Sequence, residues 1–149
     1  MSDATVNTYE SLEVGDSFRQ HRTISEEEVQ TFADLTGDDN PLHVDPEYAK
    51  NTRFGKPIIH GVLLLGVFSK ILGRDFPGHG TIAVSLSTRF LRPAPVGSDI
   101  EFRAQITEKG EKRQQVKARE RADLDETVIM GGEAVMIPPS DGEDPIDQM

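Results

Sequence analysis

The chain has 149 residues, no cysteine, and 26 acidic against 16 basic residues, which give a formal net charge of −10. The missing cysteines exclude disulfide bonds, cysteine-ligated zinc and thiol nucleophiles, and the negative charge argues against nucleic-acid binding. The longest apolar run, Gly61 to Leu72, is shorter than the roughly 20 residues that cross a membrane, and the polar start of the chain lacks the features of a secretory signal. We therefore expect one cytoplasmic domain without a membrane segment.

The excess of acid runs along the whole chain and into the final segment DGEDPIDQ. A charged, strongly hydrated surface keeps proteins in solution in a high-salt cytoplasm, where salt screens the repulsion between like charges. This pattern suggests a halophilic protein. An ordinary acidic bacterial protein would show the same excess, so both interpretations stay open.

The first part of the chain predicts a loose segment, a strand and a helix. We expect residues 1–15 to be loose, whereas residues 16–24 alternate partially between polar and apolar, as a strand does. Ser25 and Glu28 have the spacing of a capping box, and Gly37 is placed to end a helix in the left-handed conformation. A helix is therefore expected between Ser25 and Gly37.

Two further helical segments are expected before the sequence becomes rich in β-formers. Asp45 followed by Pro46 resembles a helix cap with proline at the first helical position, which predicts a short helical turn over residues 46–51. Residues 61–72 lack a polar face over about three turns, so they predict a helix that is buried all round.

The remainder of the chain predicts strands with no helix between them. Their composition is rich in β-formers, and proline, glycine or charged turns separate them. The expected strand segments are residues 81–90, 99–110, 111–123 and 127–139. This order predicts an α+β domain over residues 1–139 whose antiparallel sheet wraps the buried helix, followed by a disordered acidic tail over residues 140–149.

The loop from Gly37 to Asp45, GDDNPLHVD, concentrates polar side chains around one proline. Such residues build ordinary turns, and a metal site is a second interpretation because Asp38, Asn40, His43 and Asp45 all carry ligand atoms. The spacing matches no familiar metal loop, and we expect no metal. A third interpretation is catalytic and requires a bend that turns two side chains toward one small volume.

A carboxylate and an imidazole at such a bend would suit the addition or removal of water. Asp38 is a weak base at neutral pH unless burial or a neighbouring acid such as Asp39 strengthens it, whereas histidine titrates near neutrality. Asp38 could then take a proton and His43 could give one, with the Asn40 amide to orient them.

The stretch from Asp34 to Gly73 resembles the signature of the MaoC-like (R)-specific enoyl-CoA hydratases, also called hydratase 2, and residues 90–102 continue the resemblance. The family motif of Asp, any residue, Asn, Pro, any residue and His is filled by Asp38, Asn40, Pro41 and His43. The resemblance implies a hot-dog fold and a homodimer or higher homo-oligomer. It also implies the reversible hydration of trans-2-enoyl-CoA to (R)-3-hydroxyacyl-CoA, for polyhydroxyalkanoate synthesis or fatty-acid metabolism. No cofactor is expected, since coenzyme A is part of the substrate.

Within this resemblance Asp38 and His43 would hold the reacting water, and Asn40 would position them. The backbone N–H of Gly61 would meet the charge that develops on the thioester oxygen, which agrees with the positive end of a helix at that point. The alternative for Gly61 is tight packing alone.

Substrate-binding residues are expected along the central helix and at nearby cations. Ser69 matches a family position that contacts substrate, although its hydroxyl could equally bond to the preceding turn. The acyl tunnel is expected to be lined by Phe32, Leu42, Leu65 and Phe68, which could also be ordinary core. Candidate cations for the coenzyme A phosphates are Lys56, Arg89 and Arg92. His60 is interpreted as structural, and His21 and His79 receive no role.

Two other classes of function stay open. One is a different hot-dog enzyme, either a thioesterase or a dehydratase of an unusual acyl-CoA or acyl-carrier-protein ester. The other is a non-catalytic module that binds acyl-CoA.

Overall fold

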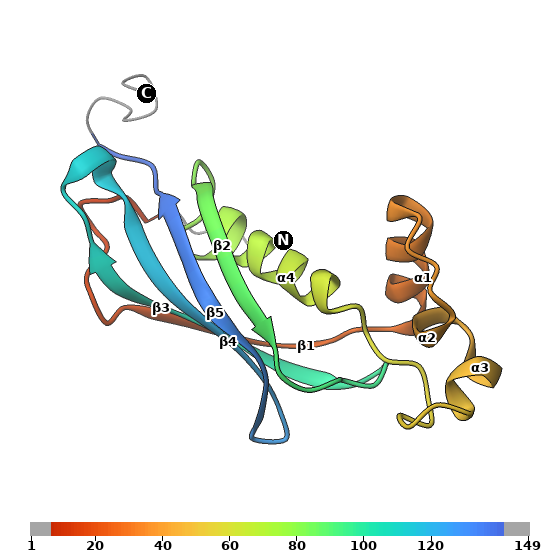
Figure 1. Ribbon diagram of the computed structural model, residues 1–149. Coiled ribbons are helices and arrows are strands. Elements are labelled where there is room, and N and C mark those ends of the chain that lie inside the picture. The colour runs from red at the N-terminus through yellow and green to blue at the C-terminus, as the bar shows by residue number, and fades with distance from the viewer. Residues whose placement is uncertain (1–6, 142–149) are drawn as a thin grey trace.

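The computed structural model describes residues 7–141, and its helices and strands follow the expected order (Figure 1). The helical elements are α1 (Glu26–Thr36), α2 (Pro41–Val44), α3 (Pro46–Lys50) and α4 (Gly61–Lys70), with a π-helical turn after α4 (Ile71–Asp75) and a 3-10 turn later (Lys112–Gln114). The strands are β1 (Ser17–Thr23), β2 (Ile82–Phe90), β3 (Asp99–Lys109), β4 (Val116–Leu124) and β5 (Thr127–Ile137). None of the described helices has the length and apolar character needed to cross a membrane.

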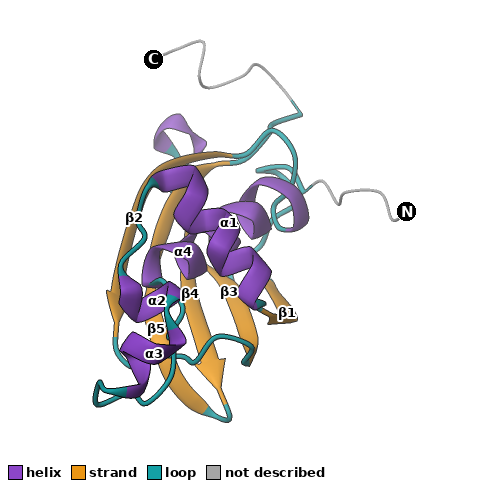
Figure 2. Ribbon diagram, turned by 90° about the vertical axis from the view of Figure 1, so that its right-hand side faces the viewer, coloured by secondary structure: helices purple, strands orange, loops and turns teal. Residues whose placement is uncertain are grey.

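The strands form one antiparallel sheet in the order β1-β3-β4-β5-β2. Helices α1 to α4 lie on the same face of this sheet, which we call the inner face (Figure 2). The predictions of a first strand and of four later strands are confirmed, and so is the α+β class. Both end strands, β1 and β2, have one free edge.

Strands β2 and β5 approach closely at Gly132. A β-carbon placed there would lie 2.0 Å from the backbone oxygen of Ser87 and 2.8 Å from the α-carbon of Thr88. Real β-carbons do not come so close to backbone atoms, so only glycine allows the two strands to pair in this register.

Helix α4 packs lengthwise on the inner face and carries the centre of the core (Figure 1). Leu64, Val67 and Phe68 are buried there, and the Phe68 ring meets the Phe102 ring edge-on at 5.3 Å between centroids. The prediction that this helix is buried all round is wrong for the single chain. Val62 is 57% exposed, because the sheet covers only one side of the helix.

The first helix begins and ends where the sequence predicts. The Ser25 side chain accepts from the Glu28 N–H, the Glu28 side chain accepts from the Ser25 N–H, and Gly37 closes the helix with φ 84°. The short helix after Pro46 is confirmed as α3, which Asp45 caps. Helix α2 was not predicted, because its single turn is too short to show periodicity in the sequence.

The segments next to the termini are more tightly held than the sequence suggests. Leu12 is fully buried, and the Tyr9 N–H donates to the Pro139 carbonyl at 2.8 Å, so the prediction of a loose segment is wrong for residues 7–15. In the expected tail, the Ser140 hydroxyl and the Asp141 N–H donate to the Glu10 carboxylate. The rest of that tail lies outside the described residues, and its disorder stays a prediction.

One ionisable residue lies within the core of the sheet. Glu120 is 3% exposed, and no described residue hydrogen-bonds to its Oε2 atom. Its neighbours across the inner face, Ala104 on β3 and Gly132 on β5, cannot pair with a carboxylate. Burial therefore raises the pKa of Glu120 to about 7.

This burial predicts a loss of stability between mildly acidic and neutral pH. The folded protein keeps the Glu120 proton up to about pH 7, whereas the unfolded chain releases it near its ordinary value of 4.5. The unfolded state thus binds fewer protons between these values, so the free energy of unfolding should fall as pH rises through them, by on the order of 3 kcal/mol. Glu120→Gln stays neutral and should gain stability relative to the parent protein between pH 5 and pH 8, as urea unfolding would measure. If the free energies of unfolding of the two proteins differed by the same amount at pH 5 and pH 8, the raised pKa of Glu120 would be contradicted.

Candidate active site

The loop between α1 and α2 is folded back by two local features. Gly37 takes the left-handed conformation, and its N–H donates to the Ala33 carbonyl at 2.8 Å. Asn40 then begins α2, because its Oδ1 atom accepts from the Leu42 N–H at 3.0 Å. The Asn40 N–H also lies 3.4 Å from Asp38 Oδ1. Asn40 therefore contacts the acid directly and caps the helix that carries His43.

His43 is oriented by a carbonyl on the other side of the site. Its Nδ1 atom lies 2.7 Å from the Ile58 carbonyl oxygen. A carbonyl only accepts, so Nδ1 must carry the proton of this bond, and in the neutral ring Nε2 has a free lone pair. Nε2 can therefore accept a proton from a bound molecule.

His60 lies between the loop and the core. Its Nε2 atom is 3.0 Å from the Asp38 carbonyl oxygen, and its ring stacks on His43 at 4.0 Å and packs against Phe32 at 4.7 Å between centroids. The residue is 2% exposed, and its Nδ1 atom has no partner among the described residues. Because Nε2 must donate to the carbonyl, Nδ1 is the unprotonated nitrogen of the neutral ring.

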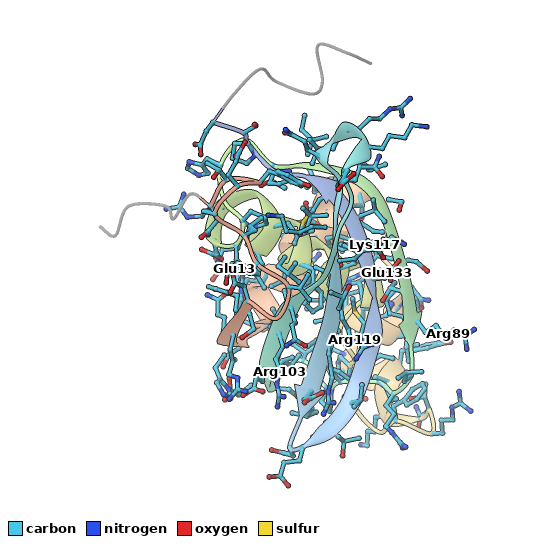
Figure 3. The ribbon with its side chains drawn as sticks, turned by 90° about the vertical axis from the view of Figure 1, so that its left-hand side faces the viewer. Glu13, Arg89, Arg103, Lys117, Arg119 and Glu133 are labelled. Carbon is cyan, nitrogen blue, oxygen red and sulfur yellow. The ribbon has the colours of Figure 1, made fainter. Side chains whose placement is uncertain are left out.

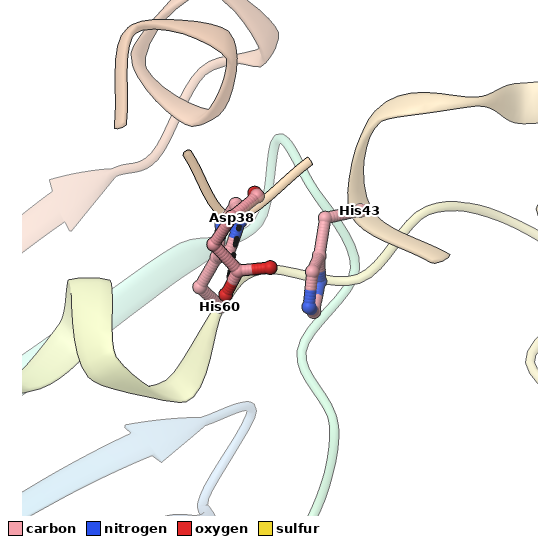
Figure 4. Close-up of side chains that lie close together, drawn as sticks. All are labelled: Asp38, His43 and His60. Atoms are coloured by element: carbon pink, nitrogen blue, oxygen red, sulfur yellow. Dashed lines mark hydrogen bonds and ion pairs between the residues drawn. The ribbon is translucent and has the colours of Figure 1, made fainter. Parts of the chain in front are cut away.

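Asp38, His43 and His60 thus form one cluster (Figure 4). One ligand atom from each lies within 4.8 Å of the others. The Asp38 side chain is half exposed and faces the space next to the His43 ring. The sequence pointed to Asp38 and His43 as the acid–base pair and interpreted His60 as structural. In the structure His60 contacts the Asp38 backbone and the His43 ring.

The three side chains open onto a cavity of about 500 Å³. Gly61, Phe90 and Leu91 line its walls, together with Arg53 and Arg92. A carboxylate, a free imidazole nitrogen and a helix N-terminus therefore share one open cavity. The geometry provides a proton acceptor, a second proton-transfer group and a backbone donor.

Gly61 is the first residue of α4 and is held against Phe90. A β-carbon at this position would lie 2.6 Å from Cδ1 of the Phe90 ring. Tight packing, the alternative considered for Gly61, is therefore present. It does not compete with the oxyanion role, because the N–H at the start of a helix has no partner within that helix.

The predicted cations occupy three different places. Arg92 lines the main cavity, and Lys56 lines a neighbouring cavity of about 280 Å³ that also contacts His43. Arg89 lies opposite Gly131 in the pairing of β2 with β5. Successive side chains of a strand point to opposite faces of the sheet, so Arg89 points away from the face on which Phe90 lines the cavity. Arg53, which sequence reasoning missed, lines the cavity instead. Its position in a turn carries no periodic signal.

The predicted acyl-tunnel residues are not gathered around the main cavity. Phe68 is fully buried in the core, and Leu65 packs against that core. Phe32 lines a shallow cavity formed mainly by α1, and the backbone carbonyl of Leu42 accepts from the Ile58 N–H at 3.2 Å. Ser69 is exposed on α4. The tunnel assignments therefore stay predictions.

The cluster has donor atoms that a metal could use, but its contacts favour hydrogen bonding. His60 Nε2 lies 3.9 Å from Asp38 Oδ2, whereas two ligands of a tetrahedral zinc site with bonds of 2.0–2.2 Å are about 3.4 Å apart. His60 Nε2 also donates to the Asp38 carbonyl. The expectation of no metal stays a prediction.

Comparison with known proteins assigns the family. Residues 11–128 match the family described as the MaoC like domain. The chain belongs to this family. Its similarity to solved structures confirms the hot-dog fold: an (R)-hydratase from A. caviae involved in PHA biosynthesis superposes with a TM-score of 0.84 at 37% identity, covering 87% of this chain and 98% of that chain.

Relatives of the MaoC-like chain carry names from both directions of one reaction. An (R)-specific enoyl-CoA hydratase from Aeromonas caviae is 42% identical over 98 residues, which are 66% of this chain and 73% of the relative. A mitochondrial 3-hydroxyacyl-[acyl-carrier-protein] dehydratase from Arabidopsis thaliana is 38% identical over 89 residues, which are 60% of this chain and 52% of the relative. The MaoC-like chain is therefore a hydro-lyase of the hydratase and dehydratase type.

The cap of α2 gives a test of how the site is positioned. Asn40→Ala removes the bond to the Leu42 N–H and lets His43 shift, so we expect kcat of the hydro-lyase reaction to fall at least about tenfold. Each substitution removes one helix cap and should lower the free energy of unfolding by about 1 kcal/mol. Asp45→Ala, which removes the cap of α3, should do so with little change in kcat. Kinetics and thermal unfolding of both variants would separate the two effects, and equal kcat losses would contradict a specific role for Asn40.

Proposed function

We propose that the chain is an (R)-specific enoyl-CoA hydratase that adds water reversibly to trans-2-enoyl-CoA. The observation that carries this proposal is the convergence of Asp38 and His43 on one cavity beside the N-terminus of α4. The names of its relatives support the same substrate class.

In this mechanism a water is held between the Asp38 carboxylate and Nε2 of His43. Its oxygen attacks C3 of the enoyl thioester, and the π electrons move toward the thioester oxygen. Asp38 and His43 together take one proton from the water and return one proton to C2, so both residues end the cycle unchanged. The product is an (R)-3-hydroxyacyl thioester, which would supply polyhydroxyalkanoate synthesis or fatty-acid metabolism.

The negative charge on the thioester oxygen requires a donor in place before the reaction. The N–H of Gly61 meets this need, because it lies at the positive end of the α4 dipole and lines the same cavity. His60 would act through its neighbours, by fixing the Asp38 backbone and supporting the His43 ring. The reaction needs no group beyond these residues, the substrate and water.

The carrier of the acyl group is a separate part of the proposal. Arg53 and Arg92 line the cavity and could neutralise phosphate groups of coenzyme A, which a protein of net charge −10 would otherwise repel. A second candidate is the dehydration of a 3-hydroxyacyl group on an acyl carrier protein, which the Arabidopsis relative favours. The same residues would then run the reaction in reverse.

Replacing the two central residues tests the catalytic proposal. Asp38→Asn and His43→Gln should each lower kcat/KM for crotonyl-CoA by at least about a hundredfold, since each removes a proton-transfer group while keeping its shape. Asp34→Asn and His79→Gln are matched controls, because both residues are exposed and neither lines the cavity. Unchanged turnover in the first pair would contradict the proposed roles of both residues, whereas a parent protein that binds crotonyl-CoA without turnover would support a module that only binds acyl-CoA.

The same assay distinguishes hydration from hydrolysis. Loss of the enoyl-thioester absorbance without release of thiol indicates hydration, whereas thiol release would indicate the thioesterase alternative. Chiral analysis of the product tests the (R) specificity.

We also propose that two copies of the chain associate through β2 and α4. The exposed side of α4 and the adjacent strand β2 present Val62, Phe90 and Leu91, each more than half exposed. Strand β2 is nine residues long at a free edge, and it lacks the lysine or proline that usually protects such edges. Pairing of two β2 strands would cover these apolar groups and the edge together.

A charge at this edge should separate the copies. Val84→Lys, at an exposed position of β2, should yield a monomer in sedimentation velocity and lower the activity, because the apolar wall of the cavity would face water. Thr23→Lys places the same charge on the opposite edge strand and should change neither property. A parent protein that sediments as an active monomer would contradict the assembly.

A further inference from the structure

The outer face of the sheet, which no helix covers, carries a row of arginines. Arg19 on β1 lies directly opposite Arg103 on β3, which lies opposite Arg121 on β4. The row continues through Gly131 on β5 to Arg89 on β2. It crosses all five strands of a protein whose net charge is −10 (Figure 3).

Such a row is unfavourable unless other groups compensate it, because like charges directly opposite each other destabilise a sheet. The ion pairs that compensate it come from the row on one side. Glu101 on β3 and Asp123 on β4 lie directly opposite each other in the next row of the outer face. Asp123, only 5% exposed, bonds Arg121 Nε at 2.8 Å and lies 3.5 Å from Arg103 Nη2, and Glu101 bonds Arg103 Nε.

These carboxylates orient the arginines as well as neutralising part of their charge. Both Arg103 and Arg121 are held through Nε, and Arg103 Nη2 also lies near Asp123, which leaves Nη1 of Arg103 and the two terminal nitrogens of Arg121 without a partner among the described residues. Hydrogen bonding by Arg103 also lowers the pKa of Glu101, so this carboxylate stays ionised and keeps its hold.

On the side away from the carboxylates the sheet is hollowed by a depression of about 250 Å³. Six outer-face side chains line it: Ser17, Arg19, Arg103, Gln105, Arg119 and Arg121. They comprise four guanidinium groups, one amide and one hydroxyl, with no carboxylate. Among the described acids none forms an ion pair with Arg119, although Glu133 lies opposite it on β5.

We propose that this depression binds a multivalent oxyanion of the phosphate or diphosphate type. Guanidinium forks bind the oxygens of such anions in pairs, and the four that line the depression carry enough positive charge to balance more than one negative charge. The depression is on the opposite face of the sheet from α4 and the catalytic cavity. It is therefore a second site, independent of the proposed hydratase reaction.

Calorimetric titration with diphosphate and with inorganic phosphate, at one fixed ionic strength set with chloride, tests this site. The parent protein should bind one diphosphate saturably, and phosphate more weakly. Arg119→Gln should weaken diphosphate binding at least about tenfold, since it removes a charged hydrogen-bond donor that holds no other residue. Lys117→Gln, the same loss of charge on the same strand but outside the depression, should bind as the parent does.

Two further measurements distinguish a phosphate site from a nucleotide site and from an extension of the substrate site. ADP should bind as tightly as diphosphate if the phosphates alone are recognised, and a much tighter ADP complex would contradict the stated chemistry. KM for enoyl-CoA should be unchanged in Arg119→Gln. A rise in KM would mean that these arginines bind the substrate and do not form a separate site. Absence of saturable binding, or equal weakening in Lys117→Gln, would overturn the proposal.

Discussion

Two hydrogen bonds from imidazole rings to backbone carbonyls hold the site together. His43 donates to Ile58, and His60 donates to Asp38, so the loop after α1 and the segment before α4 are fastened to each other in both directions. The acid, the two rings and the helix N-terminus keep their relative places only while these bonds persist. The contacts on which the chemistry depends are therefore close together in space. In the sequence, the partners are 15 residues apart in the first bond and 22 in the second.

The core supports this arrangement from below. Helix α4 has a fixed position because Phe68 and its neighbours pack on the sheet, and His60 is buried at the start of the same helix. The buried His60 ring donates to the Asp38 carbonyl through Nε2, and its Nδ1 atom has no partner among the described residues. A neutral ring with one donor nitrogen fits one carbonyl, which explains why a histidine can occupy a buried helix start without capping it.

Local chemistry made much of this structure predictable from sequence. The capping box at Ser25, the left-handed Gly37 and the proline after Asp45 each act within a few residues, so their signals survive without knowledge of the fold. The strands alternate or are rich in β-formers, and their order indicated the α+β class. The pairing of Asp38 with His43 was visible because both lie in one short loop.

Features that depend on long-range packing were not accessible in the same way. The role of His60 depends on Asp38 and His43 folding back over it, and the exposed side of α4 depends on how far the sheet reaches. Arg53 comes to the cavity through a turn that no periodicity marks, while Arg89 turns to the outer face because of strand parity. The buried Glu120 occupies an inward position that the charge alone would have assigned to the surface.

The close approach of β5 to its neighbour β2 at Gly132 links distant parts of the molecule. The strand it supports ends at Phe90, whose ring rests on Gly61, so the position of the first turn of α4 depends partly on a backbone contact elsewhere in the sheet. The sheet therefore helps to hold the helix N-terminus that lines the cavity, together with the loop that carries Asp38.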